Sequence, residues 1–168
     1  EIRYGRLGLI FKKVAIVIGA NESTPTIIKK LLNNCGEKPV DYVILLTNEE
    51  VENVREQISS YLNNNEEKRV IIYNGQLDSI EEIYKLHITR ATEIYVLGEN
   101  SNDDVSQSYH DTQNMRCVHN IASYLTDKCI ERKIICRVQF EYQTTYSVFQ
   151  FSDLPNNTIK NIIKGGIS

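Results

Sequence analysis

The sequence predicts an α/β fold in which helices cover both faces of a parallel sheet. Short apolar runs alternate along the chain with segments whose apolar residues recur every three or four positions. The first pattern indicates strands and the second indicates amphipathic helices. The strand runs are apolar throughout, which is typical of strands buried on both faces of a parallel sheet. We therefore expect a Rossmann-like, doubly wound sheet with strand order 3-2-1-4-5 and room for a sixth strand.

The expected elements have local signals at their ends. Thr24 followed by Pro25 predicts an N-cap and a first helical turn, and Gly36 predicts the end of that helix. Glu49 and Glu50 favour the start of the second helix, because acidic side chains stabilise a helix N-terminus. The strands are expected at residues 14–18, 43–46, 70–73, 94–97 and 134–138, and the helices at 24–35, 49–62, 79–86, 111–131 and 156–164.

Three segments are less regular. The asparagine run at 63–65 is expected to end the second helix, and residues 99–110 are expected to form a polar loop. The aromatic segment at 140–151 fits either a short helix or an antiparallel edge strand.

Composition narrows the class of protein. The chain has 168 residues, of which 41% are hydrophobic and 24% charged, which suits one globular domain. A net charge of −3 gives no electrostatic support for a nucleic-acid partner. No apolar run approaches the roughly 20 residues that cross a bilayer. The cysteines, none of them in a C-x-x-C pair, fit a reduced, cytosolic chain; they are Cys35, Cys117, Cys129 and Cys136.

The domain boundaries follow from the same patterns. We expect residues 1–12 to form a lead-in or linker and residues 13–151 to form the Rossmann-like domain. Residues 152–168 are expected to form a helical extension that leads to further sequence. The chain begins at Glu1 and its only methionine is Met115, so we expect one domain of a longer protein.

The candidate site lies in the loops that follow the strands, because ligands of open α/β sheets bind at the carboxyl ends of the strands. These loops carry amides, hydroxyls and carboxylates, but no lysine or arginine. The alternative is that the same residues only cap helices and form turns. No catalytic residue and no metal ligand is predicted. The candidate ligand-binding residues are Gly19, Ala20, Asn21, Glu22, Ser23, Thr47, Asn48, Gly75, Gln76, Gly98 and Glu99.

The first loop is a degenerate form of the dinucleotide motif G-x-G-x-x-G. Gly19 keeps the first glycine, but Asn21 replaces the glycine that lets backbone approach a pyrophosphate, and Thr24 replaces the third. Glu22 adds a negative charge where a helix N-terminus would attract phosphate. Thr47 stands where the second strand normally ends in a ribose-binding acid. NAD or another nucleotide is therefore disfavoured, and the cofactor stays unknown.

The segment at 74–99 carries a family resemblance. Its glycine, short acidic helix, isoleucine, alanine and apolar strand follow one another without gaps, and the matching residues are Gly75, Ile83, Ile88, Arg90, Ala91 and Ile94. This arrangement resembles the TrkA-N family, also called regulator of potassium conductance (RCK) domains, and the resemblance covers roughly residues 12–140. The chain departs from the family at Gln76, Leu86 and His87, and in its degenerate glycine motif.

The resemblance implies a function. It suggests a cytosolic ligand-sensing or assembly domain, not an enzyme, that regulates a potassium channel or uptake system at the plasma membrane. It also implies a homo-oligomer and a transmembrane region, in the same chain or in a separate one. A ligand would act by having different affinities for two domain arrangements.

Other patterns support competing hypotheses. Tyr124 and Lys128 match the Y-x-x-x-K pair of short-chain dehydrogenases, which would make the chain an NAD-dependent oxidoreductase. A ligand-free Rossmann scaffold that only assembles subunits is a third alternative. On the long helix, Ile121 lies partly off the stripe that faces the sheet, as does Tyr124, so a contact with a partner subunit is expected there unless the 140–151 segment covers them.

Two groups of residues suggest metal sites, but each has a simpler interpretation. His110, Cys117 and His119 suggest zinc, but they do not share one helical face and no fourth ligand completes the set. Asp103 and Asp104, together with Glu99, suggest calcium, although a solvated loop is favoured.

Overall fold

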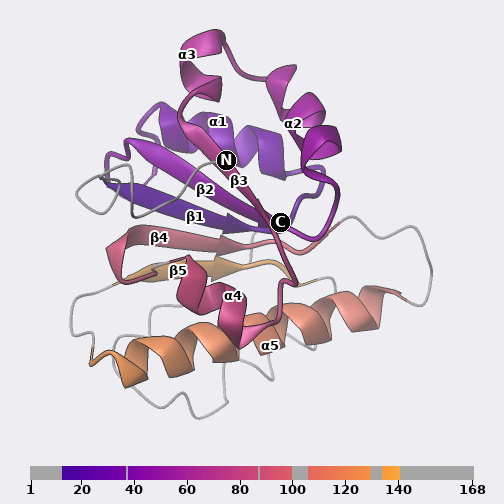
Figure 1. The fold of residues 1–168 in the computed structure, drawn as a ribbon, viewed down its shortest axis with the longest axis vertical. Coiled ribbons are helices and arrows are strands. Elements are labelled where there is room, and N and C mark those ends of the chain that lie inside the picture. The colour runs from indigo at the N-terminus through magenta and orange to yellow at the C-terminus, as the bar shows by residue number, and fades with distance from the viewer. Residues whose placement is uncertain (1–12, 37, 87, 100–105, 130–133, 141–168) are drawn as a thin grey trace.

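The chain folds around a five-stranded sheet in which every neighbouring pair of strands is parallel. The computed structural model describes residues 13–36, 38–86, 88–99, 106–129 and 134–140. The sheet order is β3-β2-β1-β4-β5 (Figure 1), so the predicted fold class and strand order are confirmed. The predictions for 1–12, 141–151 and 152–168 lie outside the described residues. The strands are β1 (Val14–Ile18), β2 (Tyr42–Thr47), β3 (Val70–Asn74), β4 (Ala91–Val96) and β5 (Ile135–Val138).

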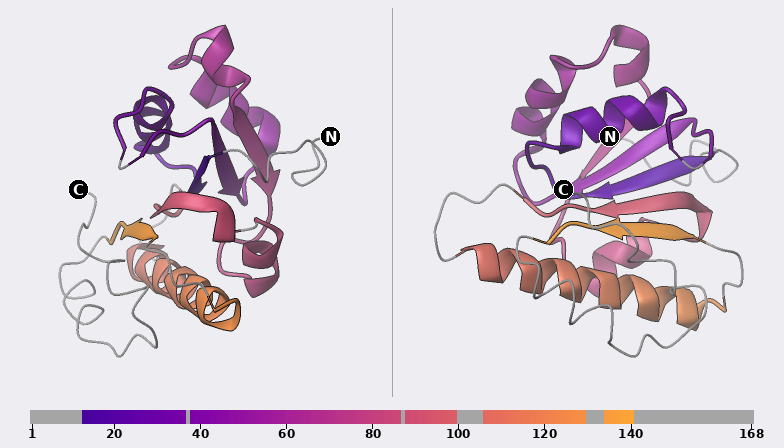
Figure 2. Two further views of the ribbon diagram at one scale, coloured as in Figure 1. Left: turned by 90° about the vertical axis from the view of Figure 1, so that its left-hand side faces the viewer. Right: turned by 180° about the vertical axis from the view of Figure 1, so that it is seen from behind.

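Helices cover both faces of the sheet. The first two helices in the chain pack on one face and the last two on the other, which the end-on view of Figure 2 shows as layers. The helices are α1 (Thr24–Leu32), α2 (Val51–Ser59), α3 (Asn64–Glu67), α4 (Ile80–Lys85) and α5 (Ser106–Asp127), with a 3-10 turn, η3 (Ile88–Arg90), before β4.

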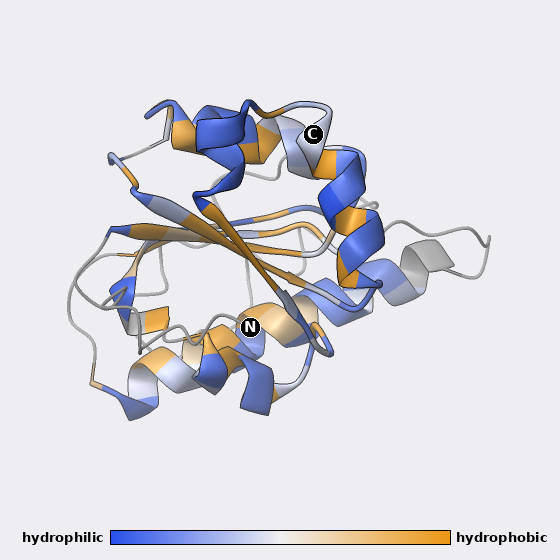
Figure 3. Ribbon diagram, turned by 45° about the horizontal axis from the view of Figure 1, so that its top comes forward, coloured by the Kyte–Doolittle hydropathy of each residue, from blue (hydrophilic) through white to orange (hydrophobic). Residues whose placement is uncertain are grey.

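The central strand β1 shows why its sequence is apolar throughout. All five of its residues are fully buried, because successive side chains point to opposite faces and each face carries a helical layer. Val14, Ile16 and Ile18 pack in the core beneath α5, whereas Ala15 and Val17 pack in the core beneath α1. In Figure 3 the strands are accordingly hydrophobic along their length, while the helices alternate between hydrophobic and hydrophilic residues.

The end of α1 differs from the prediction. This helix ends at Leu32 and not just before Gly36, and Asn34 takes the left-handed conformation, with φ of 61°, that is typical just after a helix. Asparagine tolerates this conformation better than most residues, since its short polar side chain bonds locally. At the other end, Ser23 precedes the helix and Thr24 is its first residue, so Thr24 is not the N-cap.

The prediction that the asparagine run at 63–65 ends the second helix is wrong, because α2 already ends at Ser59 and the run starts another helix. The Asn63 side chain accepts a hydrogen bond from the Glu66 backbone N–H at 2.8 Å, and the Glu66 carboxylate accepts one from the Asn63 N–H at 2.9 Å. This reciprocal capping box satisfies two backbone donors and starts α3.

The long helix begins earlier than predicted. α5 starts at Ser106, inside the stretch expected to be a loop, and ends at Asp127. Polar residues in its first turns, such as His110 and Asn114, are buried against the ends of the strands. The polar character of His110 therefore reflects its contact with the strand-end loops and does not mark a loop. Among the described residues, no helix is both long and apolar enough to cross a membrane.

Candidate functional site

Two glycine turns meet at the carboxyl ends of β1 and β4. Gly19 has φ of +106° and Gly98 has φ of +82°, conformations that side-chain-bearing residues rarely adopt. A Cβ on Gly19 would lie 2.4 Å from the backbone of Gly98, so only glycine fits. The one glycine kept from the dinucleotide motif therefore allows two backbones to approach each other. This contact brings the residue after Gly98 across the end of β1.

That residue, Glu99, bridges the first two loops through its carboxylate. One oxygen, Oε2, accepts a hydrogen bond from the Ala20 backbone N–H at 2.7 Å. The other, Oε1, accepts one from the Thr47 hydroxyl at 2.9 Å and one from the Asn48 backbone N–H. The sheet order places β1 between β2 and β4, so the Glu99 side chain spans the end of the central strand.

The pKa of Glu99 reflects two opposing effects. Burial raises its pKa above the ordinary value, because the charged form loses hydration. The three hydrogen bonds from Asn48, Ala20 and Thr47 favour the ionised form and lower the pKa, while the nearby Glu49 carboxylate raises it again. The net direction is upward, so desolvation outweighs the donors.

The first loop uses nearly all of its own hydrogen-bond donors. The Gly19 N–H donates to Leu46 O at 2.8 Å, and the Ala20 N–H donates to Glu99. The Asn21 N–H donates to Thr24 Oγ1 at 2.9 Å. The Ser23 N–H donates to Asn21 Oδ1 at 2.8 Å, and the Thr24 N–H donates to Asn21 O at 3.1 Å. A phosphate-binding loop instead directs such N–H groups at its ligand.

The Asn21 side chain joins three strand ends. Its amide nitrogen donates to Leu97 O at 3.3 Å and to Gln139 Oε1 at 3.0 Å, beyond β4 and β5 respectively. From α5, the Asn114 amide donates to Gln139 O at 2.8 Å. Gln139 and Asn114 were not predicted as site residues. The position of Gln139 after the fifth strand was the available signal.

His110 packs against the second glycine turn. Its Nε2 lies 2.9 Å from Leu97 O, and its Nδ1 lies 3.2 Å from the carboxylate of Asp111. A Cβ on Gly98 would lie 2.6 Å from His110 Nε2, so the imidazole packs closely against this turn from the side of α5. His110 and Asn114, four residues apart, share a face of α5, which places both side chains beside the strand ends.

The remaining predicted residues lie at the margin of this group. Gly75 joins it only through the backbone, where its N–H donates to Thr47 O at 2.9 Å. Gln76 and Glu22 are exposed side chains. The structure thus brings together Gly19, Ala20, Asn21, Ser23, Thr47, Asn48, Gly98 and Glu99.

The two alternative metal sites would lie at His110, Cys117 and His119 and at Asp103, Asp104 and Glu99. Cys117 is buried while His119 is exposed, so they do not converge with His110, and the described residues contain no group of three that could hold a metal. Asp103 and Asp104 lie outside the described residues.

The prediction that Ile121 and Tyr124 on α5 form a contact surface for a partner subunit is wrong. Ile121 is 0% exposed and Tyr124 is 4% exposed, because α4 also packs on this helix and widens its buried stripe. The Tyr84 and Tyr124 rings meet edge-to-face with centroids 4.6 Å apart, and the Lys128 ammonium lies 5.6 Å from the Tyr84 ring centre.

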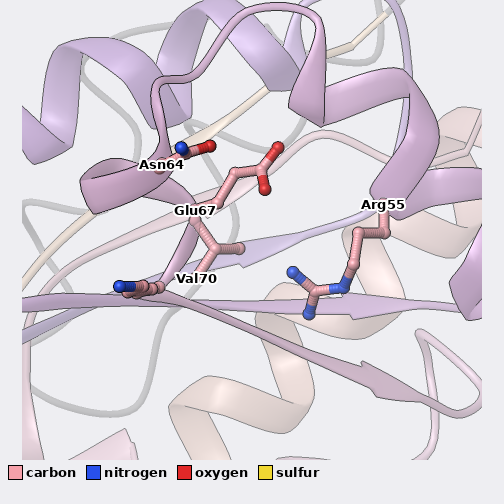
Figure 4. A pocket seen from close by; sticks show the side chains of 5 residues that line it. Arg55, Asn64, Glu67 and Val70 are labelled. Atoms are coloured by element: carbon pink, nitrogen blue, oxygen red, sulfur yellow. The ribbon is translucent and has the colours of Figure 1, made fainter.

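A hollow of about 410 Å³ lies elsewhere, beside α2, α3 and the start of β3. Figure 4 shows Arg55 and Glu67 reaching into it from different helices. Val70 is the first residue of β3, so the hollow lies at the amino end of that strand. Ligands of this fold class bind at the opposite, carboxyl end. Its lining residues are Arg55, Asn64, Glu67, Lys68 and Val70.

The fold and the strand-end loops define a dinucleotide-type α/β domain whose phosphate loop is internally bonded. Comparison with known proteins gives the family. Residues 11–162 match the family described as the calcium-activated potassium channel slowpoke-like RCK domain, and the chain belongs to that family. A search of curated proteins finds no match.

Solved structures share the fold. The GsuK channel bound to NAD matches with a TM-score of 0.54 and 12% identity, over 90% of this chain and 21% of that one. The GsuK RCK domain matches with the same score and identity, over 90% and 25%. The TrkA-N domain of the inner membrane protein ybaL from Escherichia coli matches with a TM-score of 0.54 and 14% identity, over 91% and 87%. The chain therefore spans a fifth to a quarter of the GsuK chains, and the resemblance to the TrkA-N and RCK family is confirmed.

Proposed function

We propose that this chain is a regulatory domain on the cytosolic side of a potassium channel or potassium uptake system. The observation that carries the proposal is the family match over residues 11–162, together with an RCK-type sheet. The pore or transport region would lie in the same protein or in a separate subunit. The chain would act by changing its arrangement, and not by catalysis.

The strand-end loops are the proposed responsive element. Asn21 ties together loops that follow β1, β4 and β5, while Glu99 ties together loops that follow β1, β2 and β4. A change at any one loop therefore disturbs the others. For such a change to regulate flux, two arrangements must differ in their affinity for the regulator.

An oxidoreductase is the less favoured candidate. Tyr124 lies ten residues beyond Asn114 on α5, which is about 15 Å along a helix. Its buried ring packs against Tyr84, away from the strand ends where a cofactor would bind. The match to the NAD-bound GsuK channel supports a nucleotide, but the loop donors that would hold a pyrophosphate are already engaged within this chain. The residues present do not fit a dinucleotide.

Ion flux through the full-length protein tests the proposed function. Deleting residues 13–140 should change the rate of potassium flux or its response to the regulator. Asn21→Ala should also change gating, because it removes the ties to Leu97 and Gln139. Asn53→Ala, an exposed asparagine on α2, is the matched control and should leave gating unchanged. Identical flux and gating in the deletion and in wild type would contradict the proposal.

Assembly and location complete the proposal. We expect a homo-oligomer held at the cytosolic face of the plasma membrane by the pore or transport region. Sedimentation of the full-length protein should give a mass above that of one subunit, and a monomer at all concentrations would contradict this part.

A further inference from the structure

We propose that Glu99 is a built-in anion that occupies the donors at the ends of β1 and β2 and closes this cleft to a dinucleotide pyrophosphate. This role belongs to the strand-end loops, and it rests on the proposed function only for its consequence for regulation. The carboxylate does inside the chain what a bound anion would do in a related domain.

The first step is the geometry of the donors. Glu99 takes three of them: the N–H groups of Ala20 and Asn48 and the hydroxyl of Thr47. Backbone N–H groups at the start of a helix and at strand ends are the donors that anions use in this fold. A carboxylate and a phosphate accept hydrogen bonds from the same groups, so the two would compete for one place.

The second step is that the donors beside them are also engaged. In the first loop, Asn21 and Ser23 donate their N–H groups within the loop. In the second, the Glu49 N–H donates to Thr47 Oγ1 at 3.0 Å. An incoming pyrophosphate would have to break these bonds as well as displace Glu99.

The charges of the loops also oppose the binding of a phosphate. Glu22 lies on the first loop and Glu49 on the second, and no lysine or arginine stands in the loops after β1, β2 or β4. One oxygen of Glu49 is buried without a hydrogen-bond partner among the described residues. A phosphate would enter a negative field, whereas the Glu99 carboxylate is held there by the glycine contact between Gly19 and Gly98.

The consequence is a change in how the domain is regulated. The carboxylate fixes the ends of β1, β2 and β4 in an anion-bound geometry without any ligand. Regulation would then act by displacing or protonating Glu99, or at another surface, and not by NAD binding.

Chemical rescue of Glu99→Ala tests the proposal. Removing the carboxylate should lower the melting temperature, since three donors lose their acceptor. Formate supplies a free carboxylate, and a ligand that binds only the folded state raises its melting temperature. At equal ionic strength, formate should therefore raise the melting temperature of Glu99→Ala above its value in chloride, by on the order of 2 °C.

Glu22→Ala is the matched control, since it removes an exposed acid from the first loop, which also carries Ala20, without freeing the donors that Glu99 occupies. For wild type, the melting temperature in formate should equal that in chloride, and the same should hold for Glu22→Ala. A folded Glu99→Ala variant without a formate-specific rise would overturn the proposal, and so would an equal rise in all three proteins.

Calorimetric titration of the wild-type chain with NAD keeps the proposal testable if Glu99→Ala does not fold. No saturable heat is expected, and saturable binding of NAD that shifts the amide signals of Ala20 and Asn48 would overturn it. These readings need no ion flux, so a failed flux experiment removes the proposed function without affecting the rescue result.

Discussion

Replacing Gly19 with alanine should destabilise the domain strongly. A Cβ at this position would lie 2.4 Å from backbone atoms of Gly98, which cannot swing aside as a side chain can. The backbone conformation, with φ of +106°, adds strain of about 1–3 kcal/mol for a residue with a side chain. Overpacking against the neighbouring turn adds about 1–3 kcal/mol more. The free energy of unfolding should therefore fall by about 2–6 kcal/mol, a large fraction of the stability of an ordinary domain.

Urea unfolding followed by circular dichroism measures this loss, with Gly75→Ala as the control. Gly75 has no positive φ, and its added Cβ would meet the flexible side chain of Glu82 at 2.6 Å. Gly75→Ala should therefore change the free energy of unfolding by about 1 kcal/mol or less. If Gly19→Ala proves no less stable than Gly75→Ala, the close approach of the two glycine turns is refuted.

Three further predictions concern the scaffold. The hydrogen bonds that Glu66 accepts, that from Lys29 first, lower its pKa from 4.5 to about 2. Its ionised form therefore stabilises the fold above pH 4.5, and this stability is lost as the pH falls toward 2. Glu66→Gln should flatten the dependence of the urea midpoint on pH in this range. Ile121→Ala should lower the free energy of unfolding by about 2–5 kcal/mol, whereas Tyr109→Ala, at a side chain that is 55% exposed, should change it by about 0.5 kcal/mol or less; similar losses would contradict the packing of α5. Burial raises the pKa of the Cys117 thiol well above its ordinary value, so iodoacetamide should label exposed Cys129 in the native protein and leave Cys117 unmodified until unfolding, as mass spectrometry would show.

The sheet could be predicted from the sequence because its signal is strong and local. Strands buried on both faces need apolar residues at every position, and β1 has no other kind. The strand order 3-2-1-4-5 is that of the Rossmann type, and right-handed crossovers place the loops after the strands along one edge. Helix ends were harder to predict, because asparagine serves both to end a helix, as Asn34 does, and to start one, as Asn63 does.

The site was predictable where it depends on the loops that follow the strands. Gly19, Thr47 and Glu99 were chosen because the carboxyl ends of parallel strands share one edge of the sheet. Asn114 and His110 were missed, since their contacts come from α5 and not from a loop that follows a strand, and His110 lies in a stretch that was expected to be a loop. Which donors Glu99 would satisfy depends on contacts between residues up to 79 positions apart, and no local pattern encodes them.

A pH titration of the wild-type chain by nuclear magnetic resonance tests the central claim most directly. The side-chain carboxyl carbon of Glu99 and the amide signals of Ala20 and Asn48 would be followed together. If the carboxylate binds these two donors, the three signals should change with one shared midpoint, and burial should place that midpoint above 4.5. Amide signals that stay constant while Glu99 titrates, or a Glu99 midpoint below 4.5, would contradict the account.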